Sequence, residues 1–152
     1  MILGGEIKGT NLYAVFSLLA GTKFNGTLEL QASGHTVVAF LCNGSLSYLE
    51  SDDVAQSFPA FLLSSGQMQR DDLMAAMNLA SQENSSLLEA LKSVGKMSQR
   101  NIAVWVREHG MKLLASMYAE PSIQYLTSAS PPPRTAMGTP CNWERQNINA
   151  EW

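Results

Sequence analysis

The residues that could perform acid–base or nucleophilic chemistry are few, and they lie far apart in the sequence. His35 follows a Ser-Gly turn and His109 lies in a long helical stretch, and neither has a second His, Cys or carboxylate at metal-ligand spacing. Cys42 ends a strand-like run, with no basic neighbour in the sequence to activate its thiol. A histidine or cysteine in such isolation is typical of structural positions. We therefore predict no catalytic residue, and the chain is not expected to be an enzyme.

The acidic pairs and the glycines also have a structural interpretation. The aspartate pairs at residues 52–53 and 71–72 stand where helices are expected to begin. Carboxylates at that position stabilise free N–H groups and the helix dipole without a metal ion. No glycine-rich phosphate loop of the G-x-G-x-x-G or G-K-[ST] type occurs between a strand and a helix. The sequence thus predicts neither a metal site nor a cofactor site.

Length and composition exclude further classes. A chain of 152 residues and 16.5 kDa suffices for one ordinary domain, or for a compact domain with a helical appendix. With a net charge of −3 and 15% charged residues it lacks a basic stripe, so nucleic acid is not an expected partner. No apolar run of 18 residues and no basic leader occur, which argues against membrane insertion and a signal peptide. Cys42 and Cys141 form neither a disulfide framework nor a zinc signature, and we expect a cytoplasmic protein.

The first third of the chain predicts one helix followed by strands. Apolar residues at helical spacing indicate an amphipathic helix over residues 11–21, with Asn11 as its N-cap and Gly21 at its end. From residue 26 the pattern changes to the alternation that is typical of strands. Asn43 and Gly44 predict a tight hairpin, because a type I′ turn needs positive φ at both positions. This hairpin is expected to pair Leu41 with Leu46, Ala39 with Tyr48, and Phe40 with Ser47.

A phrase in the second half of the chain occurs twice, 29 positions apart. "LLSSGQMQRDDL" at residues 62–73 returns as "LKSVGKMSQRNI" at residues 91–102. Ser57 and Ser86 are expected to begin helices, and Gly66 and Gly95 to end them. The pattern predicts a duplicated helical hairpin, whose apolar stripes form a core more readily than a partner groove. The residues of these stripes are Leu62, Leu73, Met77, Leu87, Leu91, Ile102, Val106 and Leu113.

Together these patterns predict an α+β domain over residues 1–130. It comprises a small antiparallel sheet with one packed helix (1–51), a layer of about four helices (52–119) and a final strand (122–128). The proline-rich remainder, 131–152, is expected to be a flexible tail. Three tryptophans are the predicted partner-binding residues. Trp105 either anchors the helical layer or is an exposed interaction hot spot, and Trp143 and Trp152 lie in the polar tail, where they could fold on a partner.

The stretch "GTNLYAVFSLLAGTKFNGTLELQASGHTVVAFLCNGSLSYLES", residues 9–51, resembles the opening of the PATAN family, a bacterial domain found with response regulators. The resemblance rests on an opening helix, on a strand with Gly26, Leu28 and Leu30, and on the Asn43-Gly44 hairpin. It implies a non-catalytic adaptor in bacterial signal transduction, motility or cell polarity. A signalling protein, a small GTPase or a motility protein would be its partner. The sequence does not decide whether the chain also forms a homodimer.

The helical repeat is similar to the N-terminal domain of type II secretion and pilus ATPases, some of which bind cyclic di-GMP. In that family an Arg-Leu-Gly triplet opens each motif and a Gln closes it. The matching triplets here are 57–59 and 86–88, and the closing residues are Ala80 and His109. The ligand-reading side chains are absent from both copies. A cyclic di-GMP-type sensor therefore stands as the alternative function.

Overall fold

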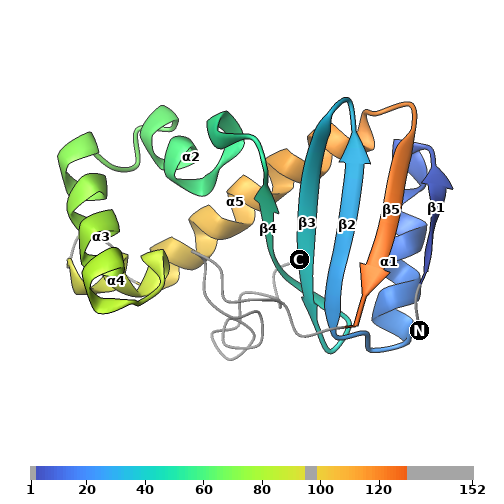
Figure 1. Cartoon of the computed structure of the whole chain (residues 1–152), viewed down its shortest axis with the longest axis horizontal. Helices are drawn as coiled ribbons and strands as arrows, with labels where there is room; N and C mark the ends of the chain where they lie inside the picture. The colour runs from blue at the N-terminus through green and yellow to red at the C-terminus, as the bar shows by residue number, and fades with distance from the viewer. Residues whose placement is uncertain (1–2, 95–98, 130–152) are drawn as a thin grey trace.

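The computed structural model describes residues 3–94 and 99–129, with the backbone alone at residues 99 and 100. Its fold is α+β, as predicted, and is built on a five-stranded antiparallel sheet (Figure 1). The strands lie in the order β1-β5-β2-β3-β4. Their bounds are β1 Gly4–Ile7, β2 Gly26–Ala32, β3 His35–Cys42, β4 Ser45–Ser51 and β5 Ile123–Ser128.

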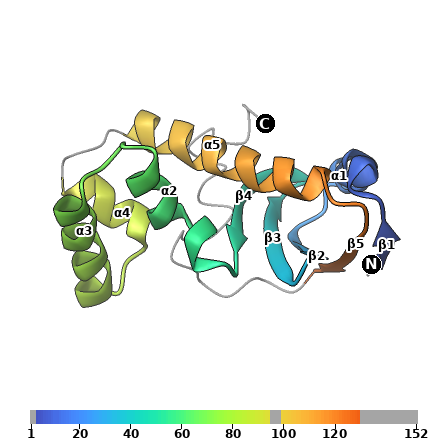
Figure 2. The ribbon, with the colours of Figure 1, turned by 90° about the horizontal axis from the view of Figure 1, so that it is seen from above.

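The helices are α1 Leu12–Gly21, α2 Phe58–Ser64, α3 Arg70–Glu83, α4 Leu87–Ser93 and α5 Gln99–Tyr118. Two short 3₁₀ turns, η1 Gly9–Asn11 and η2 Val54–Gln56, precede α1 and α2. Figure 2 shows α1 and the end of α5 on one side of the sheet, with α2, α3 and α4 beyond its β4 edge. The predicted bounds of α1 hold, although the Asn11 side chain makes no capping hydrogen bond.

The predicted hairpin is present, but its register differs from the expected one. Asn43 and Gly44 have φ of 55° and 81°, and Leu41 pairs with Leu46 as predicted. A bulge then shifts the ladder by one residue, so Phe40 faces Tyr48 and Ala39 faces Leu49. The predicted pairs Ala39–Tyr48 and Phe40–Ser47 are therefore wrong, because one additional residue in a strand exchanges its two faces. The rings of Phe40 and Tyr48 stack, with their centroids 4.6 Å apart.

The predicted final strand forms β5, and it lies inside the sheet between β1 and β2. The first described residues and the last ones are therefore neighbours. Leu3 N–H donates to the Thr127 hydroxyl at 2.7 Å, and Thr127 N–H donates to Leu3 O at 2.8 Å.

The sequence did not predict β1, since a strand of four residues with two glycines has little of the alternating pattern that is typical of strands.

The predicted interval of the helical repeat is confirmed by the bounds of the helices, but the two hairpins are not, because α3 packs mainly against α4 and α2 against α5. Phe58 and Leu87 begin α2 and α4, and Arg70 and Gln99 begin α3 and α5, so each pair starts 29 positions apart. The Ser57 and Ser86 hydroxyls accept hydrogen bonds from Ala60 N and Glu89 N at 3.3 and 3.2 Å, which confirms both caps. Gly66 has φ of 74°, as its predicted place requires, and Gly95 lies outside the described residues.

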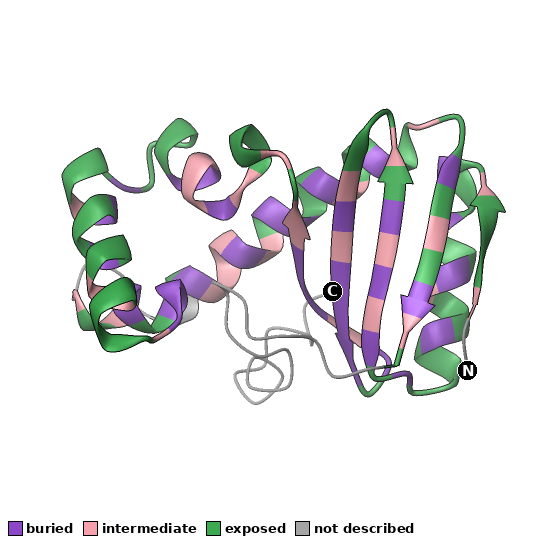
Figure 3. Ribbon diagram, viewed as in Figure 1, coloured by how far each residue is buried: buried purple, intermediate pink, exposed green. Residues whose placement is uncertain are grey.

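Two clusters of buried side chains meet along α5. Ile102 and Val106 belong to the cluster of the helical arm, which is α2, α3, α4 and the first half of α5. Leu113 and Met117 belong to the cluster between α1 and the sheet. The predicted stripe is buried with one exception, since Met77 is 40% exposed and Ala76 takes the buried position in α3. A small alanine lets the adjacent helix approach closely, and Figure 3 shows the outer side of α3 exposed.

Candidate functional site

The three predicted partner-binding residues do not form a shared surface that the structure describes. Trp105 is partly buried and packs against the cluster of the helical arm. Trp143 and Trp152 lie outside the described residues. A role for Trp105 in binding thus stays a prediction, and its observed contacts are those of a side chain that supports the core.

The residues with potential chemistry lie in separate places. His35 is half exposed, with its Nδ1 4.0 Å from Asp53 Oδ2. Cys42 is buried at the end of β3 and has no free thiol, contrary to the expectation from the sequence, and His109 is buried in α5. Asp53 accepts a hydrogen bond from Ala55 N at 3.0 Å and Asp52 one from Thr36 N at 2.9 Å. Within the described ranges, no group of three or more His, Cys, Asp or Glu is placed to hold a metal ion.

A small cavity lies where the sheet, the helical arm and α5 meet, and we call it the joint cavity. Its volume is about 250 Å³, and it is lined by residues 49–51 of β4, residues 57–59 at the start of α2, Leu87 of α4 and His109. These residues come from four separate parts of the chain. The joint cavity therefore depends on how the helical arm packs against the sheet.

His109 is the buried polar residue of this joint. Its Nε2 lies 2.7 Å from Gln56 O, while its Nδ1 is buried without a hydrogen-bond partner. The rings of Phe58 and Phe61 lie 5.5 and 5.6 Å from the imidazole, centroid to centroid. Burial lowers the pKa of His109 below its ordinary 6.5, the hydrogen bond to Gln56 opposes this shift, and the charge of Lys112 adds to it.

The joint cavity brings together positions at which a cyclic di-GMP-binding repeat would hold its ligand. Residues 57–59, Leu87 and His109 all line it. The chemistry is nevertheless poor for a phosphate, because its lining includes the Glu50 carboxylate and no Lys or Arg. Pockets for drug-sized ligands also measure about 300 Å³ or more. The geometry gives little support to a nucleotide site here.

A second concave surface lies between α1 and α5, and we call it the α1–α5 groove. Its volume is about 350 Å³. The lining residues are Leu12, Tyr13, Phe16, Met111, Leu114, Ala115 and Tyr118. All of them are apolar or aromatic, and Tyr13, Met111 and Tyr118 are more than half exposed. A groove of this composition suits apolar side chains of another molecule.

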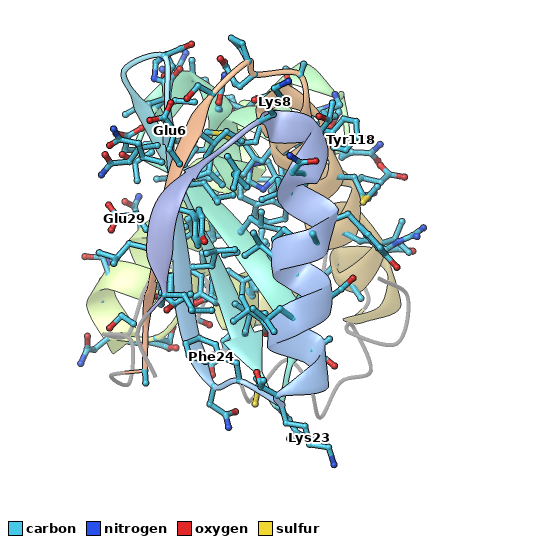
Figure 4. The ribbon with its side chains drawn as sticks, turned by 90° about the vertical axis from the view of Figure 1, so that its right-hand side faces the viewer. Glu6, Lys8, Lys23, Phe24, Glu29 and Tyr118 are labelled. Atoms are coloured by element: carbon cyan, nitrogen blue, oxygen red, sulfur yellow. The ribbon has the colours of Figure 1, made fainter. Side chains whose placement is uncertain are left out.

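The exposed side of α1 extends this apolar surface. None of the ten residues of α1, "LYAVFSLLAG", is charged. Tyr13 is 77% exposed and Leu18 is 50% exposed. Figure 4 shows this side of the molecule, with Lys8 and Lys23 beyond the two ends of α1 and Tyr118 next to it. Surface helices ordinarily carry charged residues on the side that faces water, so α1 is unusual.

A glycine fixes the end of the α1–α5 groove. Gly9 N–H donates to Glu120 O at 2.9 Å, which ties η1 to the turn after α5. A Cβ at Gly9 would lie only 2.6 Å from Tyr118 O and 2.5 Å from Glu120 O. Only glycine allows this approach, because both neighbours are backbone atoms. This contact therefore ties the segment before α1 to the segment after α5, the two helices that line the groove.

Sequence reasoning treated α1 as a helix of the core and missed the groove. The signal in the sequence was the absence of charged residues from positions 12–21. A helix that packs on one side only can carry charge on its other side, so this absence needed an explanation.

None of the helices in the described part of the chain is long and apolar enough to cross a membrane. Comparison of the chain with protein-family models, curated proteins and solved structures found no match.

Proposed function

We propose that this chain is a non-catalytic protein–protein interaction module, and that it binds its partner through the α1–α5 groove and the exposed side of α1. The observation that carries this proposal is an uncharged surface helix beside a groove lined by apolar and aromatic residues. Tyr13, Met111 and Tyr118 are exposed around it, and Tyr and Met are enriched where proteins bind one another.

The shape of the groove favours a helix as the bound element. Its two walls are the helices α1 and α5, and an amphipathic helix can place apolar residues at positions i, i+3, i+4 and i+7 between them. The rigid support comes from the sheet under α1 and from the helical arm at the other end of α5. The repeated pair of helices would then be a scaffold and not a pair of ligand sites.

The resemblance to the PATAN family indicates the cellular process in which such a module would act. It suggests an adaptor in bacterial signal transduction, motility or cell polarity, which acts in the cytoplasm on a signalling protein, a small GTPase or a motility protein. Such an adaptor needs a surface and no catalytic group.

Site-specific photo-cross-linking tests the proposal. A benzophenone amino acid in place of Tyr13 is expected to cross-link one defined partner in the native cells. Ala115→Glu places a charge in the groove at an exposed position and should weaken binding of that partner at least about tenfold. Met74→Glu is the matched control, because Met74 is 47% exposed on α3, outside the groove.

The outcomes separate the alternatives. Equal binding by the Ala115→Glu and the unmodified chain, with both folded by circular dichroism, would refute the groove as the binding surface. A cross-linked product of the chain with itself would identify a second copy as the partner, which is the homodimer that the sequence leaves open.

Calorimetry with cyclic di-GMP near physiological salt tests the alternative sensor function. We expect no binding heat, since the joint cavity is small and its lining includes the Glu50 carboxylate and no Lys or Arg. Binding with a dissociation constant of about 1 µM or below would correspond to a binding free energy of about −8 kcal/mol or more negative. That result would favour the sensor over the adaptor.

A further inference from the structure

We propose that His109 makes the attachment of η2 and α2 to α5 sensitive to pH, so that proton uptake by its buried Nδ1 loosens the joint between the helical arm and the sheet. The proposal concerns the conformation of the molecule and is independent of the α1–α5 groove.

His109 has a central position in this joint. It lies in α5 between Val106, which belongs to the cluster of the helical arm, and Leu113, which belongs to the cluster of the sheet. Its hydrogen bond to Gln56 O holds η2, the connection between β4 and α2. A change at this one side chain therefore acts on the contact between the two parts.

The hydrogen bond determines which ring nitrogen carries the proton. A carbonyl oxygen can only accept, so Nε2 of His109 donates its N–H to Gln56 O over 2.7 Å. Nδ1 is then the unprotonated nitrogen, and it is buried with no partner. A proton on Nδ1 would create both a buried donor without an acceptor and a buried positive charge, and each is costly.

The groups around His109 do not compensate such a charge. Lys112, on the same helix, is positive, and its Nζ lies 5.1 Å from the centroid of the Phe61 ring, so a cation already occupies that aromatic face. Glu50 of β4 also lines the joint cavity, but its carboxylate is not among the groups that shift the pKa of His109. The residues that η2, α2 and α4 place around His109 or the cavity carry no charge: Gln56, Ser57, Phe58, Pro59, Phe61 and Leu87.

The sign of the pH effect follows from the lowered pKa of His109, whose largest cause is burial. Above the ordinary value of 6.5 the residue is neutral in both the closed and the open joint, and the contact is at full strength. As the pH falls below 6.5 the open joint binds a proton before the closed one does. Opening is then favoured increasingly until the pH reaches the lowered pKa of the closed state.

Hydrogen exchange of the full chain at about pH 7.5 and about pH 5.5 tests the inference. We expect the protection factors of residues 54–64, corrected for intrinsic exchange, to fall at the lower pH by up to about tenfold per unit, the limit for one proton. His109→Gln should abolish this dependence, because its amide can still donate to Gln56 O but does not titrate. His35→Gln is the control and should retain it, since His35 lies near Asp53 at the start of η2 and does not line the joint cavity.

Three results would overturn the proposal. One is equal protection of residues 54–64 at both pH values, and another is a fall that persists in His109→Gln. The third is a fall that disappears in His35→Gln, which would assign it to the pair His35–Asp53. Nuclear magnetic resonance of the unmodified chain gives an independent check that needs no variant. A His109 imidazole that titrates at or above about pH 6.5 would contradict the buried, unpartnered Nδ1.

Discussion

Gly9 shows how a single residue determines the shape of the proposed binding surface. We expect Gly9→Ala to lower the free energy of unfolding by about 2 kcal/mol, because its methyl group would overlap the backbone oxygens of Tyr118 and Glu120. The end of α5 would have to move away from η1 and widen the α1–α5 groove. Urea unfolding measures the loss of stability, and the cross-linking yield from residue 13 measures the effect on the groove.

Gly21→Ala is the matched control for this change. No atom lies within 4 Å of a Cβ at Gly21, the last residue of α1, so the substitution meets no clash. Alanine has the higher helix propensity, and we expect a gain of up to about 1 kcal/mol. Equal effects of the two substitutions would show that the close contact at Gly9 has no energetic consequence.

At the scale of the elements, the helical repeat predicts equal costs at equivalent positions. Leu62 in α2 and Leu91 in α4 stand 29 positions apart, and both are fully buried in the cluster of the helical arm. Each change to alanine should cost about 2–5 kcal/mol, because it removes apolar contacts and leaves a cavity. Leu63→Ala should cost much less, since Leu63 is 41% exposed. Urea unfolding of the three variants measures these costs.

A large difference between the unfolding free energies lost in Leu62→Ala and in Leu91→Ala would contradict the interpretation of the repeat as a structural duplication. The duplication would then be one of sequence only, with α2 and α4 in different surroundings. Agreement within about 1 kcal/mol is the expected result, given how measured costs scatter with local packing.

The local signals in the sequence were sufficient to place most of the elements. Serine caps at Ser57 and Ser86 and the turn at Asn43 and Gly44 are determined by neighbouring residues, and the structure confirms them. Features that depend on distant partners could not be obtained in this way. The bulge at Phe40 is one example, since no residue beside the turn indicates it. The exposure of Met77 is another, because it depends on how closely α4 approaches α3.

The candidate surfaces were less accessible to sequence reasoning than the fold. The α1–α5 groove combines Leu12 and Tyr13 with Met111 and Tyr118, which are distant in the chain and are brought together by the packing of α1 and α5 against the sheet. The joint of His109 with Gln56 has the same origin. The sequence showed that His109 has no chemical neighbours along the chain, whereas its unpartnered nitrogen is a property of the packed structure.

At the scale of the whole molecule, α5 joins the two buried clusters, and β3 and β4 also supply residues to both. Its first half supplies Ile102 and Val106 to one cluster, and its second half supplies Leu113 and Met117 to the other. In Figure 1 this helix runs from the helical arm to the far side of the sheet. A helix is cooperative along its length, so disruption of either cluster weakens the support of the other.

We therefore expect one cooperative unfolding transition for the whole molecule. Ile102→Ala and Leu28→Ala remove buried side chains from different clusters. Each should lower the midpoint of the same unfolding transition, and far-ultraviolet circular dichroism and tryptophan fluorescence should report the same midpoint.

Gly110→Pro should divide this transition into two, because proline within α5 removes a backbone hydrogen bond between the clusters. Its control is Glu108→Ala, an exposed position in the same helix, which should leave one transition. Two separate transitions in the unmodified chain would mean that α5 holds the arm and the sheet together without coupling their stability.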